Sequence, residues 1–499
     1  MQESGASKMA KTQQKVSISP KIKETEQYMK DRIGTETSYD VGFREMIILK
    51  QQLQLYYVNG LCDSALVVEI MKMLIAVNDF ESNRPKLKEI IHNRLVHEQV
   101  EIVETMDEAV DQLLSGLIVI FLDGESMAFV IDLRSYPGRT PQEPDTERVI
   151  RGSRDGYTEN IVVNTALTRR RVRDARLRNE MLKVGERSKT DVCISYIEDI
   201  ADDGLVREIK NKISAIDIDG LSMADKTVDE FILDSKWNLY PLVRYTERPD
   251  VAANHLLEGH VIIMTDTSPS VIIIPTTYFH HLQHAEEYRQ SPVVGTFIRW
   301  IRFLAVFLSI YLLPMWLLFT MEPSLLPNAL DFIGPEKHGH VPIILQIIIA
   351  DIGVEFLRMA AIHTPTPLST ALGLIAAVLV GQIAVDVGLF SPEVILYVAV
   401  SVIGSYVTPS YELSVSNKLA KLFLLLATAI FGVSGFMIAL TINLLFMVST
   451  RALKTPYFWP FIPFNAYAML HIIFRIPVPF ADKRPSITHP KNVYRQPRR

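Results

Sequence analysis

The chain has few of the residue patterns on which catalysis and nucleotide binding usually depend. Its two cysteines, Cys62 and Cys193, are too far apart in sequence for a CxxC site and too few for a disulfide framework, which fits a reducing compartment. Neither a P-loop (GxxxxGK followed by Ser or Thr) nor a GxGxxG sequence occurs at an expected strand-to-helix turn. No serine, cysteine or histidine nucleophile system is recognisable. We therefore expect no cofactor and no enzymatic activity.

The first residues also lack the apolar segment of a cleavable signal peptide. Residues 1–40 are polar and are expected to form a mobile segment, with Ser19-Pro20 as a structure breaker. Insertion into a membrane would then depend on later helices.

Charge divides the chain near residue 296. Residues 1–296 contain 36 Lys and Arg against 47 Asp and Glu, a net charge of −11, whereas residues 297–499 contain 15 against 9, a net charge of +6. The first part is long enough for two soluble cores, because domains usually have about 100–150 residues. The second part contains most of the long apolar runs and is expected to be a bundle of membrane helices.

Two predicted β-hairpins indicate two α/β subdomains in the first part. Residues 117–134 and 260–277 each consist of two β-branched runs joined by turn residues. Both hairpins follow the same short phrase, Leu-Leu-Ser-Gly at 113–116 and Leu-Leu-Glu-Gly at 256–259. We interpret this as two related helix-then-hairpin units, although one shared phrase can also arise by chance.

Five apolar runs follow, each close to or above the roughly 20 residues that span a bilayer, except the fourth. They cover residues 297–320, 341–360, 368–390, 392–407 and 419–449. The fifth is too long for one upright crossing, so it is either strongly tilted or broken into a hairpin near residues 432–435. The expected fold class is thus an α/β soluble N-terminal half with two subdomains, followed by an α-helical polytopic membrane domain. The expected boundaries are a mobile segment 1–40, subdomains 41–180 and 181–296, a transmembrane domain 297–475 and a basic cytoplasmic tail 476–499.

Basic residues near the ends of the runs predict orientation. Arg299 and Arg302 hold the end of the soluble half at the cytoplasmic face, whereas the loop 321–340 carries only Lys337 and should lie outside. Lysine and arginine residues bracket both ends of the fifth run. Both ends therefore favour the cytoplasm, which supports the hairpin interpretation and an even number of crossings.

Carboxylates within the apolar runs are the main candidates for a functional site. A charge in hydrocarbon is costly, so Asp351, Glu355 and Asp386 indicate an ion or proton path. Asp351 and Glu355 are one helical turn apart and share a face, which in a homo-oligomer could give a ring of carboxylates that selects cations. The alternative is an ion pair of Glu355 with Arg358 at the membrane edge. Gln382 lies on the same face as Asp386, and both need polar partners.

Small residues recur at helical spacing in the third run and predict close helix packing. They are Gly373, Ala377, Gly381, Ala384 and Gly388.

Two further clusters have ordinary explanations beside functional ones. His280, His284 and Glu287 have the spacing of a zinc triad, but a hydrated helix beside the membrane explains them equally well, and we expect no metal. A run of arginines could indicate nucleic acid, but no aromatic platform accompanies it, and a solvated or salt-bridged helix face is favoured. The run consists of Arg169, Arg170, Arg171, Arg173, Arg176 and Arg178.

Several long motifs identify a family resemblance from about residue 40 onward. They are RGSRDGYTENIVVNTALTRRR (151–171), VGERSKTDVCISYIEDIAD (184–202), IDIDGL (216–221), YPLVRYTERPDVAANHLLEGHVIIMTDTSPSVIIIP (240–275), EFLRMAAIHTPTPLSTALGLIAAVLVGQIAVDVGLFSPEVI (355–395) and GSYVTPSYELS (404–414). The chain resembles the A subunit of the GerA-type spore germination receptors of endospore-forming bacteria. Residues 26–45 and 54–63 resemble a receptor-like sporulation paralogue within this family rather than a nutrient-receptor subunit. Family members usually carry other residues at the three histidine positions 280, 281 and 284, which argues against a shared zinc site.

The resemblance implies a multi-pass protein of the inner spore or forespore membrane, with its N-terminal half facing the spore core. It also implies a homo-oligomer around a pore, with other membrane subunits as partners. The implied activity is release of monovalent cations at germination, when a receptor-type partner gates or amplifies the channel. The alternative is a non-conducting scaffold that clusters germination receptors. A third possibility is a secondary transporter. Transporters of that class have paired broken helices in repeated halves, whereas this sequence has one candidate break.

Overall fold

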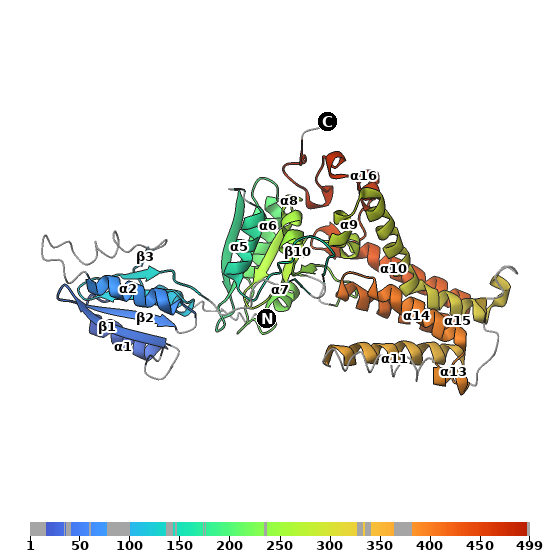
Figure 1. Cartoon of the computed structure of the whole chain (residues 1–499), viewed down its shortest axis with the longest axis horizontal. Coiled ribbons are helices and arrows are strands. Elements are labelled where there is room, and N and C mark those ends of the chain that lie inside the picture. Colours follow the sequence, from blue (N-terminus) through green and yellow to red (C-terminus); the bar gives the residue numbers. More distant parts are fainter. Residues whose placement is uncertain are drawn as a thin grey trace, which may run out of the picture. The chain divides into compact units, whose positions relative to one another are not determined.

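The computed structural model describes most of the chain, in segments separated by gaps. The described residues are 16–33, 35, 41–58, 61–76, 100–135, 143–144, 147–172, 174, 176–233, 237–326, 333–334, 341–363 and 382–496. They form two compact units, Met1–Gly138 and Arg139–Arg499 (Figure 1).

The first unit is a five-stranded antiparallel sheet covered on both faces by helices. Its elements are α1 (Ile22–Ile33), β1 (Val41–Ile48), β2 (Gln51–Val58), α2 (Ser64–Ala76), β3 (Val100–Val103), α4 (Met106–Leu114), β4 (Ile118–Leu122) and β5 (Ala128–Ile131). The strand order is β1-β2-β4-β5-β3. Every residue of β4 is buried, because Ile118, Ile120 and Leu122 face α2 while Val119 and Phe121 face α1 and α4.

The second unit begins with a sheet of the same kind. Its elements are α5 (Ile161–Arg171), β6 (Leu177–Val184), β7 (Thr190–Ile197), α6 (Asp203–Ser214), α7 (Ala224–Ile232), β8 (Arg244–Thr246), α8 (Pro249–Leu257), β9 (Val261–Thr265) and β10 (Val271–Ile274). The strand order is β6-β7-β9-β10-β8. Helices α6 and α7 cover one face, and α5 and α8 cover the other.

The two sheets have the same connectivity, which confirms the two related units inferred from the repeated phrase. If the strands of each sheet are numbered from one to five along the chain, both sheets have the spatial order 1-2-4-5-3. The shared phrase is the helix end that precedes the second hairpin of each sheet. Gly116 and Gly259 have φ of 90° and 96°, a conformation that favours glycine. The N–H of Leu117 donates to Gln112 O at 3.3 Å, and the N–H of His260 donates to His255 O at 3.0 Å.

Helix α5 belongs with the second sheet. Its residue Ile161 packs in one core with Leu256 of α8 and Ile262 of β9. The first compact unit ends at Gly138, whereas the sequence analysis divided the two subdomains after residue 180. The difference has a physical reason, because the segment before β6 supplies a helix that covers the following sheet rather than the preceding one.

A helical region follows in the second unit. It contains η2 (Tyr278–Leu282), α9 (Ala285–Arg289), α10 (Pro292–Met321), α11 (Ile343–His363), α13 (Ala384–Asp386), α14 (Pro392–Tyr406), α15 (Tyr411–Ser449), a short pair β11 (Arg451–Ala452) and β12 (Thr455–Pro456), and α16 (Ala466–Ile473). In Figure 1, α14 and α15 lie beside α10, in agreement with the cores that they share. Among the described residues, α10 and α15 are long and apolar enough to cross a membrane.

Helix α15 is a hairpin that reverses at Gly432, whose φ and ψ are 58° and −136°. A Cβ added to Gly435 would lie 2.0 Å from Ala427 O, whereas eight residues of continuous helix would separate the two by about 12 Å. Beyond the far end of α15, Lys454 Nζ lies 2.9 Å from Glu208 Oε2 of α6. The break predicted near residues 432–435 is therefore confirmed, and the chain on leaving α15 returns to the second sheet.

The C-terminal segment packs back on the second sheet. Thr488 Oγ1 donates to Glu258 O at 2.8 Å, and the N–H of Lys491 donates to Ile200 O at 2.9 Å. The expected tail 476–499 is thus part of the second unit as far as residue 496, where the description ends.

Candidate functional site

The candidate site is a set of ion pairs between α11 and the first half of α15. Asp351 and Glu355 lie one turn apart on α11, and Lys418 and Lys421 lie about one turn apart on α15. Asp351 Oδ1 lies 2.6 Å from Lys421 Nζ. Glu355 pairs with both Lys418 and Arg358. Both carboxylates are thus neutralised within one chain.

The inner pair is more deeply buried than the outer cluster. The exposed fraction is 1% for the Lys421 side chain and 10% for Asp351, whereas it is 29% for Glu355. A buried charge is tolerated only when a partner offsets its lost hydration. The two charges of the inner pair therefore depend on each other.

The order of the pairs defines the direction of the helices. Asp351 meets Lys421, while the later Glu355 meets the earlier Lys418, so α11 runs antiparallel to the first half of α15. That half, from Tyr411 to the reversal at Gly432, is about 31 Å long, which matches the hydrocarbon thickness of a bilayer. Lys421 is eleven residues from Gly432, or about 16 Å along the axis. The inner pair therefore lies about midway along the hairpin.

The other predicted residues lie elsewhere or outside the described chain. Gln382 and Asp386 are exposed, at a short helical turn, and within the described residues no ion pair joins Asp386 to α15. Ala384 is buried. Gly388 follows the end of α13 with φ of 74°, so it is not inside a helical stripe. The remaining packing residues, Gly373, Ala377 and Gly381, lie outside the described residues.

A second cluster of buried charges joins α9, α10 and α16. Glu287 of α9 is fully buried and pairs with Arg299 and Arg302 of α10. The Arg299 Nε donates to Glu287 Oε2 at 2.7 Å, and its Nη1 donates to His471 O at 2.8 Å and to Ile472 O at 3.0 Å, near the C-terminal end of α16. A cation is favourable at that end of a helix. This junction cluster couples the start of the first long apolar helix to α16.

The junction cluster engages one of the three residues, His280, His284 and Glu287, that have the spacing of a zinc triad. Glu287 is engaged by the two arginines, while His280 Nδ1 accepts from the N–H of Thr277 at 3.0 Å. His284 accepts from the N–H of Glu286 at 3.2 Å and caps α9. The three side chains therefore have separate structural roles.

Several arginines of the basic run are engaged inside the second unit. Arg171 pairs with Asp155, Arg176 with Asp174 and Asp199, and Arg178 with Glu198. Arg169 donates to the carbonyl groups of Asp174 and Leu177. This pattern matches a salt-bridged surface.

Comparison with known proteins identifies the family of this chain. The family model described as "Bacillus/Clostridium GerA spore germination protein" matches residues 27–487. The chain belongs to the GerA spore germination protein family. This confirms the resemblance inferred from the motifs.

Within the GerA family the chain is similar to a curated sporulation protein and, at lower identity, to a curated germination protein. It is 59% identical to "Stage V sporulation protein AF" of Bacillus subtilis (strain 168) over 97% of this chain and 98% of that protein. It is 28% identical to "Spore germination protein KA" of the same organism, over 96% and 89% of the two chains. The narrower resemblance of residues 26–45 and 54–63 is thereby confirmed.

A solved structure is also similar, the N-terminal domain of the A subunit of the Bacillus megaterium spore germinant receptor GerK3. The sequence identity is 25% and the TM-score is 0.22, over 52% of this chain and 96% of that chain.

Sequence reasoning about this GerA-family chain missed the partners of the carboxylates. Lys418 and Lys421 were used only to orient the fifth run. A signal was present, because two lysines at i and i+3 inside an apolar helix need anions on a facing helix. Glu287 was considered only as a metal ligand, although the arginine pair 299 and 302 at the same spacing offered it two cationic partners.

Proposed function

We propose that this GerA-family protein is an oligomeric membrane channel subunit that releases monovalent cations during spore germination, gated or amplified by a receptor-type partner. The observation that carries the proposal is the buried pair Asp351–Lys421, about midway along a helical hairpin of membrane-spanning length. Ionisable groups at that depth are rare because they are costly, and they typically mark an ion path.

The pairing suggests how the channel is closed. While Lys421 occupies Asp351, and Lys418 and Arg358 occupy Glu355, neither carboxylate can take the place of water around a passing cation. A movement of α11 away from α15 would separate the charges and present the carboxylates to the ions. In a ring of subunits, that movement would open one path lined by several copies.

The junction cluster supports a route for the gating signal. Glu287 lies in α9, between the last strand of the second sheet and α10, and pairs with Arg299 and Arg302 of α10. All three charges are buried. If α9 moved without α10, Glu287 and the two arginines would lose their partners, so the two helices are expected to move together. A partner that acts on the sheet would thus move α10, which packs against α14 and α15.

The location that we propose is the inner spore membrane, with the two sheets facing the spore core. Leu413 near the start of α15 and Met447 near its end share one core with Leu242, which lies just before β8 of the second sheet. Both ends of the hairpin are therefore on the side of this sheet, which supports an even number of crossings. Two curated relatives are named as a sporulation protein and a germination protein. We propose that the partners are further copies of this chain, other membrane subunits of germination complexes and the bilayer itself.

A non-conducting scaffold is the second candidate, and one observation favours it. The carboxylates are neutralised within a single chain, as a purely structural contact between helices requires.

Potassium efflux from liposomes separates the two candidates. The purified chain is reconstituted as the wild type, as Lys421→Gln, which leaves Asp351 without its cation, and as Lys454→Gln, a lysine at the sheet end of the same region. A channel held closed by the ion pairs predicts faster efflux for Lys421→Gln than for the wild type and for Lys454→Gln. A scaffold predicts the efflux rate of empty liposomes for all three proteins.

A further inference from the structure

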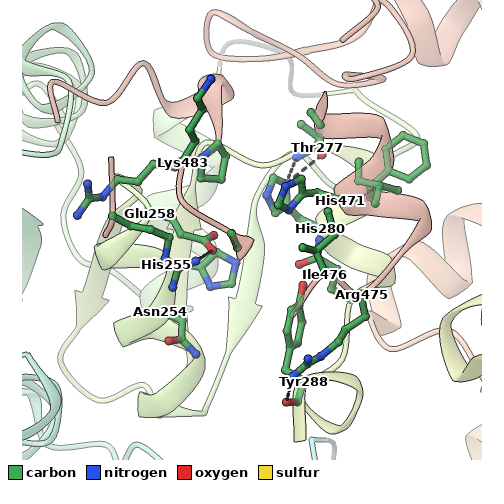
Figure 2. Close-up of a pocket in the computed structure, with 18 of the residues that line it drawn as sticks. Asn254, His255, Glu258, Thr277, His280, Tyr288, His471, Arg475, Ile476 and Lys483 are labelled. Atoms are coloured by element: carbon green, nitrogen blue, oxygen red, sulfur yellow. Dashed lines mark hydrogen bonds and ion pairs between the residues drawn. The ribbon is translucent and has the colours of Figure 1, made fainter. Parts of the chain in front are cut away.

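The second unit contains a cavity of about 970 Å³ between α8 and the segment that includes α16 and the C-terminal residues. Figure 2 shows His255, Glu258 and Lys483 on one side of it and His280 and Arg475 on the other. Its volume is at the upper end of the range for small-molecule sites in proteins. No role in the proposed conduction has been assigned to it, and the inference below is independent of that proposal.

The wall of the cavity is strongly basic. Among the described residues, seven arginine and lysine side chains line it, against two carboxylates, Asp250 and Glu258. Asp250 already pairs with Arg289 at 2.7 Å, and Glu258 lies 3.8 Å from Arg495. The wall therefore carries more positive charge than its own carboxylates neutralise.

Four of these cations have no carboxylate within ion-pair distance among the described residues. They are Arg244, Arg475, Lys483 and Arg484. Arg244 donates to His280 O at 2.9 Å, and Arg475 donates to Tyr288 O at 2.8 Å. Carbonyl groups position a guanidinium but do not cancel its charge. An anion that entered the cavity would supply the missing counter-charge.

Several buried polar atoms of the wall also lack a partner in the described structure. They include His255 Nε2, Arg299 Nη2 and Arg475 Nε. His255 Nδ1 lies 2.8 Å from Val251 O and must carry the proton there, so its Nε2 is an acceptor. Buried polar atoms are nearly always satisfied in native proteins, which indicates a ligand with both acceptor and donor groups.

Part of the remaining wall is apolar, and the cavity reaches α10. Phe279, Ile472 and Val478 line the cavity, and so does Arg299 of α10. The site thus suits a molecule that joins a charged and hydroxylated head to an apolar body. Arginine and lysine side chains from several directions match the oxygens of a phosphate better than those of one planar carboxylate.

We propose that this cavity binds a phosphate-bearing anion, either the head group of an anionic phospholipid or a soluble organophosphate. Arg475 and Lys483 contact the phosphate from opposite walls, and His255 accepts a hydrogen bond from a hydroxyl of the ligand.

Two probes distinguish the sources. The full chain is placed in nanodiscs of mixed phosphatidylglycerol and phosphatidylcholine, and retained lipid is counted by native mass spectrometry. In parallel, the thermal midpoint in detergent is measured with inorganic pyrophosphate. The variants are Arg475→Gln, Lys483→Gln and, as a control outside the cavity, the exposed Arg451→Gln. Loss of one charge-assisted hydrogen bond should weaken binding by about tenfold.

A preference for phosphatidylglycerol that falls in both cavity variants but not in Arg451→Gln supports the lipid. A pyrophosphate-induced rise of the thermal midpoint that is lost in the same variants supports the soluble anion. Binding of neither probe, or equal binding by wild type and cavity variants, overturns the proposal. Lys483→Gln decides the matter if Arg475→Gln does not fold, because the Lys483 ammonium lies over the Tyr467 ring at 5.6 Å and removing it breaks no buried ion pair.

Discussion

At the residue scale, burial determines the chemistry of the titratable side chains in the second unit. Burial raises the pKa of the Cys193 thiol to about 11, so this residue carries no reactive thiolate at neutral pH. Burial also lowers the pKa of His260 to about 4 and that of His281 to about 3. These histidines are therefore neutral core residues at neutral pH rather than charged groups of a surface site.

The histidines predict a dependence of stability on pH. His281 has a folded-state pKa of about 3 and an unfolded pKa near 6.5, so between these values the unfolded state binds more protons. Its contribution is fully present above pH 6.5 and is lost as the pH falls toward 3. His281→Phe keeps an aromatic ring beside Tyr457 and removes the titration.

We expect the thermal midpoint of His281→Phe to fall less between pH 7 and pH 4.5 than that of the wild type, measured by intrinsic fluorescence of the full chain in detergent. His489→Asn, at an exposed residue with φ of 46° that asparagine tolerates, is the control and should retain the wild-type slope. An unchanged slope in His281→Phe would contradict the assigned pKa.

At the scale of elements, the arrangement of the helical region depends on the close approach of the two halves of α15 and on the buried charges of the junction cluster. The α15 hairpin reverses at one glycine, and the junction cluster joins three helices through Glu287 and Arg299. Both features depend on single residues whose replacement has a defined consequence.

The hairpin predicts different effects for three glycine-to-alanine changes. Gly435→Ala would place a Cβ 2.0 Å from Ala427 O, so the two halves must separate, at a cost of about 1–3 kcal/mol. Gly432→Ala meets no atom within 4 Å, but its φ of 58° and ψ of −136° strongly favour glycine, so the change costs about 1–3 kcal/mol in backbone strain. Gly353→Ala in α11 is also open and should be neutral or stabilising. We expect the thermal midpoint of Gly353→Ala to be higher than the midpoints of Gly432→Ala and Gly435→Ala, and a midpoint for Gly435→Ala equal to that of Gly353→Ala would rule out the hairpin.

The junction cluster predicts a large effect of Glu287→Gln. The change leaves the buried guanidinium groups of Arg299 and Arg302 without a carboxylate, which costs about 3–5 kcal/mol. Hydrogen exchange should accelerate in α9 and also in α16, because Arg299 holds the last carbonyl groups of α16. Glu322→Gln, at the exposed opposite end of α10, serves as the control and should leave exchange unchanged. Faster exchange confined to α9 would show that the cluster does not couple the two helices.

At the scale of the whole molecule, the sequence predicts features that are encoded within a few neighbouring residues, but not contacts between residues far apart in the chain. The repeated phrase before each hairpin indicated two related sheets, because a helix end with glycine is encoded within a few residues. Gly432 and Gly435 indicated the hairpin for the same reason. The spacing of Asp351 and Glu355 predicted their shared face.

The partners of these residues could not be predicted in the same way. Lys421 is 70 positions from Asp351, and the pairing depends on how two apolar helices with similar surfaces pack. The cavity likewise combines Arg244 with Arg475 and Lys483, which come together only once the C-terminal segment folds back on α8. Sequence spacing contains no information about either arrangement.

The central claim is that the Asp351–Lys421 contact lies on the path of the ions. The most direct measurement is the reversal potential of the reconstituted chain in a planar bilayer under a potassium chloride gradient, for Lys421→Met, in which the closing ion pair is broken, and for Asp351→Asn combined with Lys421→Met. Our account predicts that Lys421→Met is cation-selective and that the reversal potential of the double variant moves toward zero, because the carboxylate that favours cations is gone. An unchanged reversal potential, or the absence of current from both proteins, would contradict it.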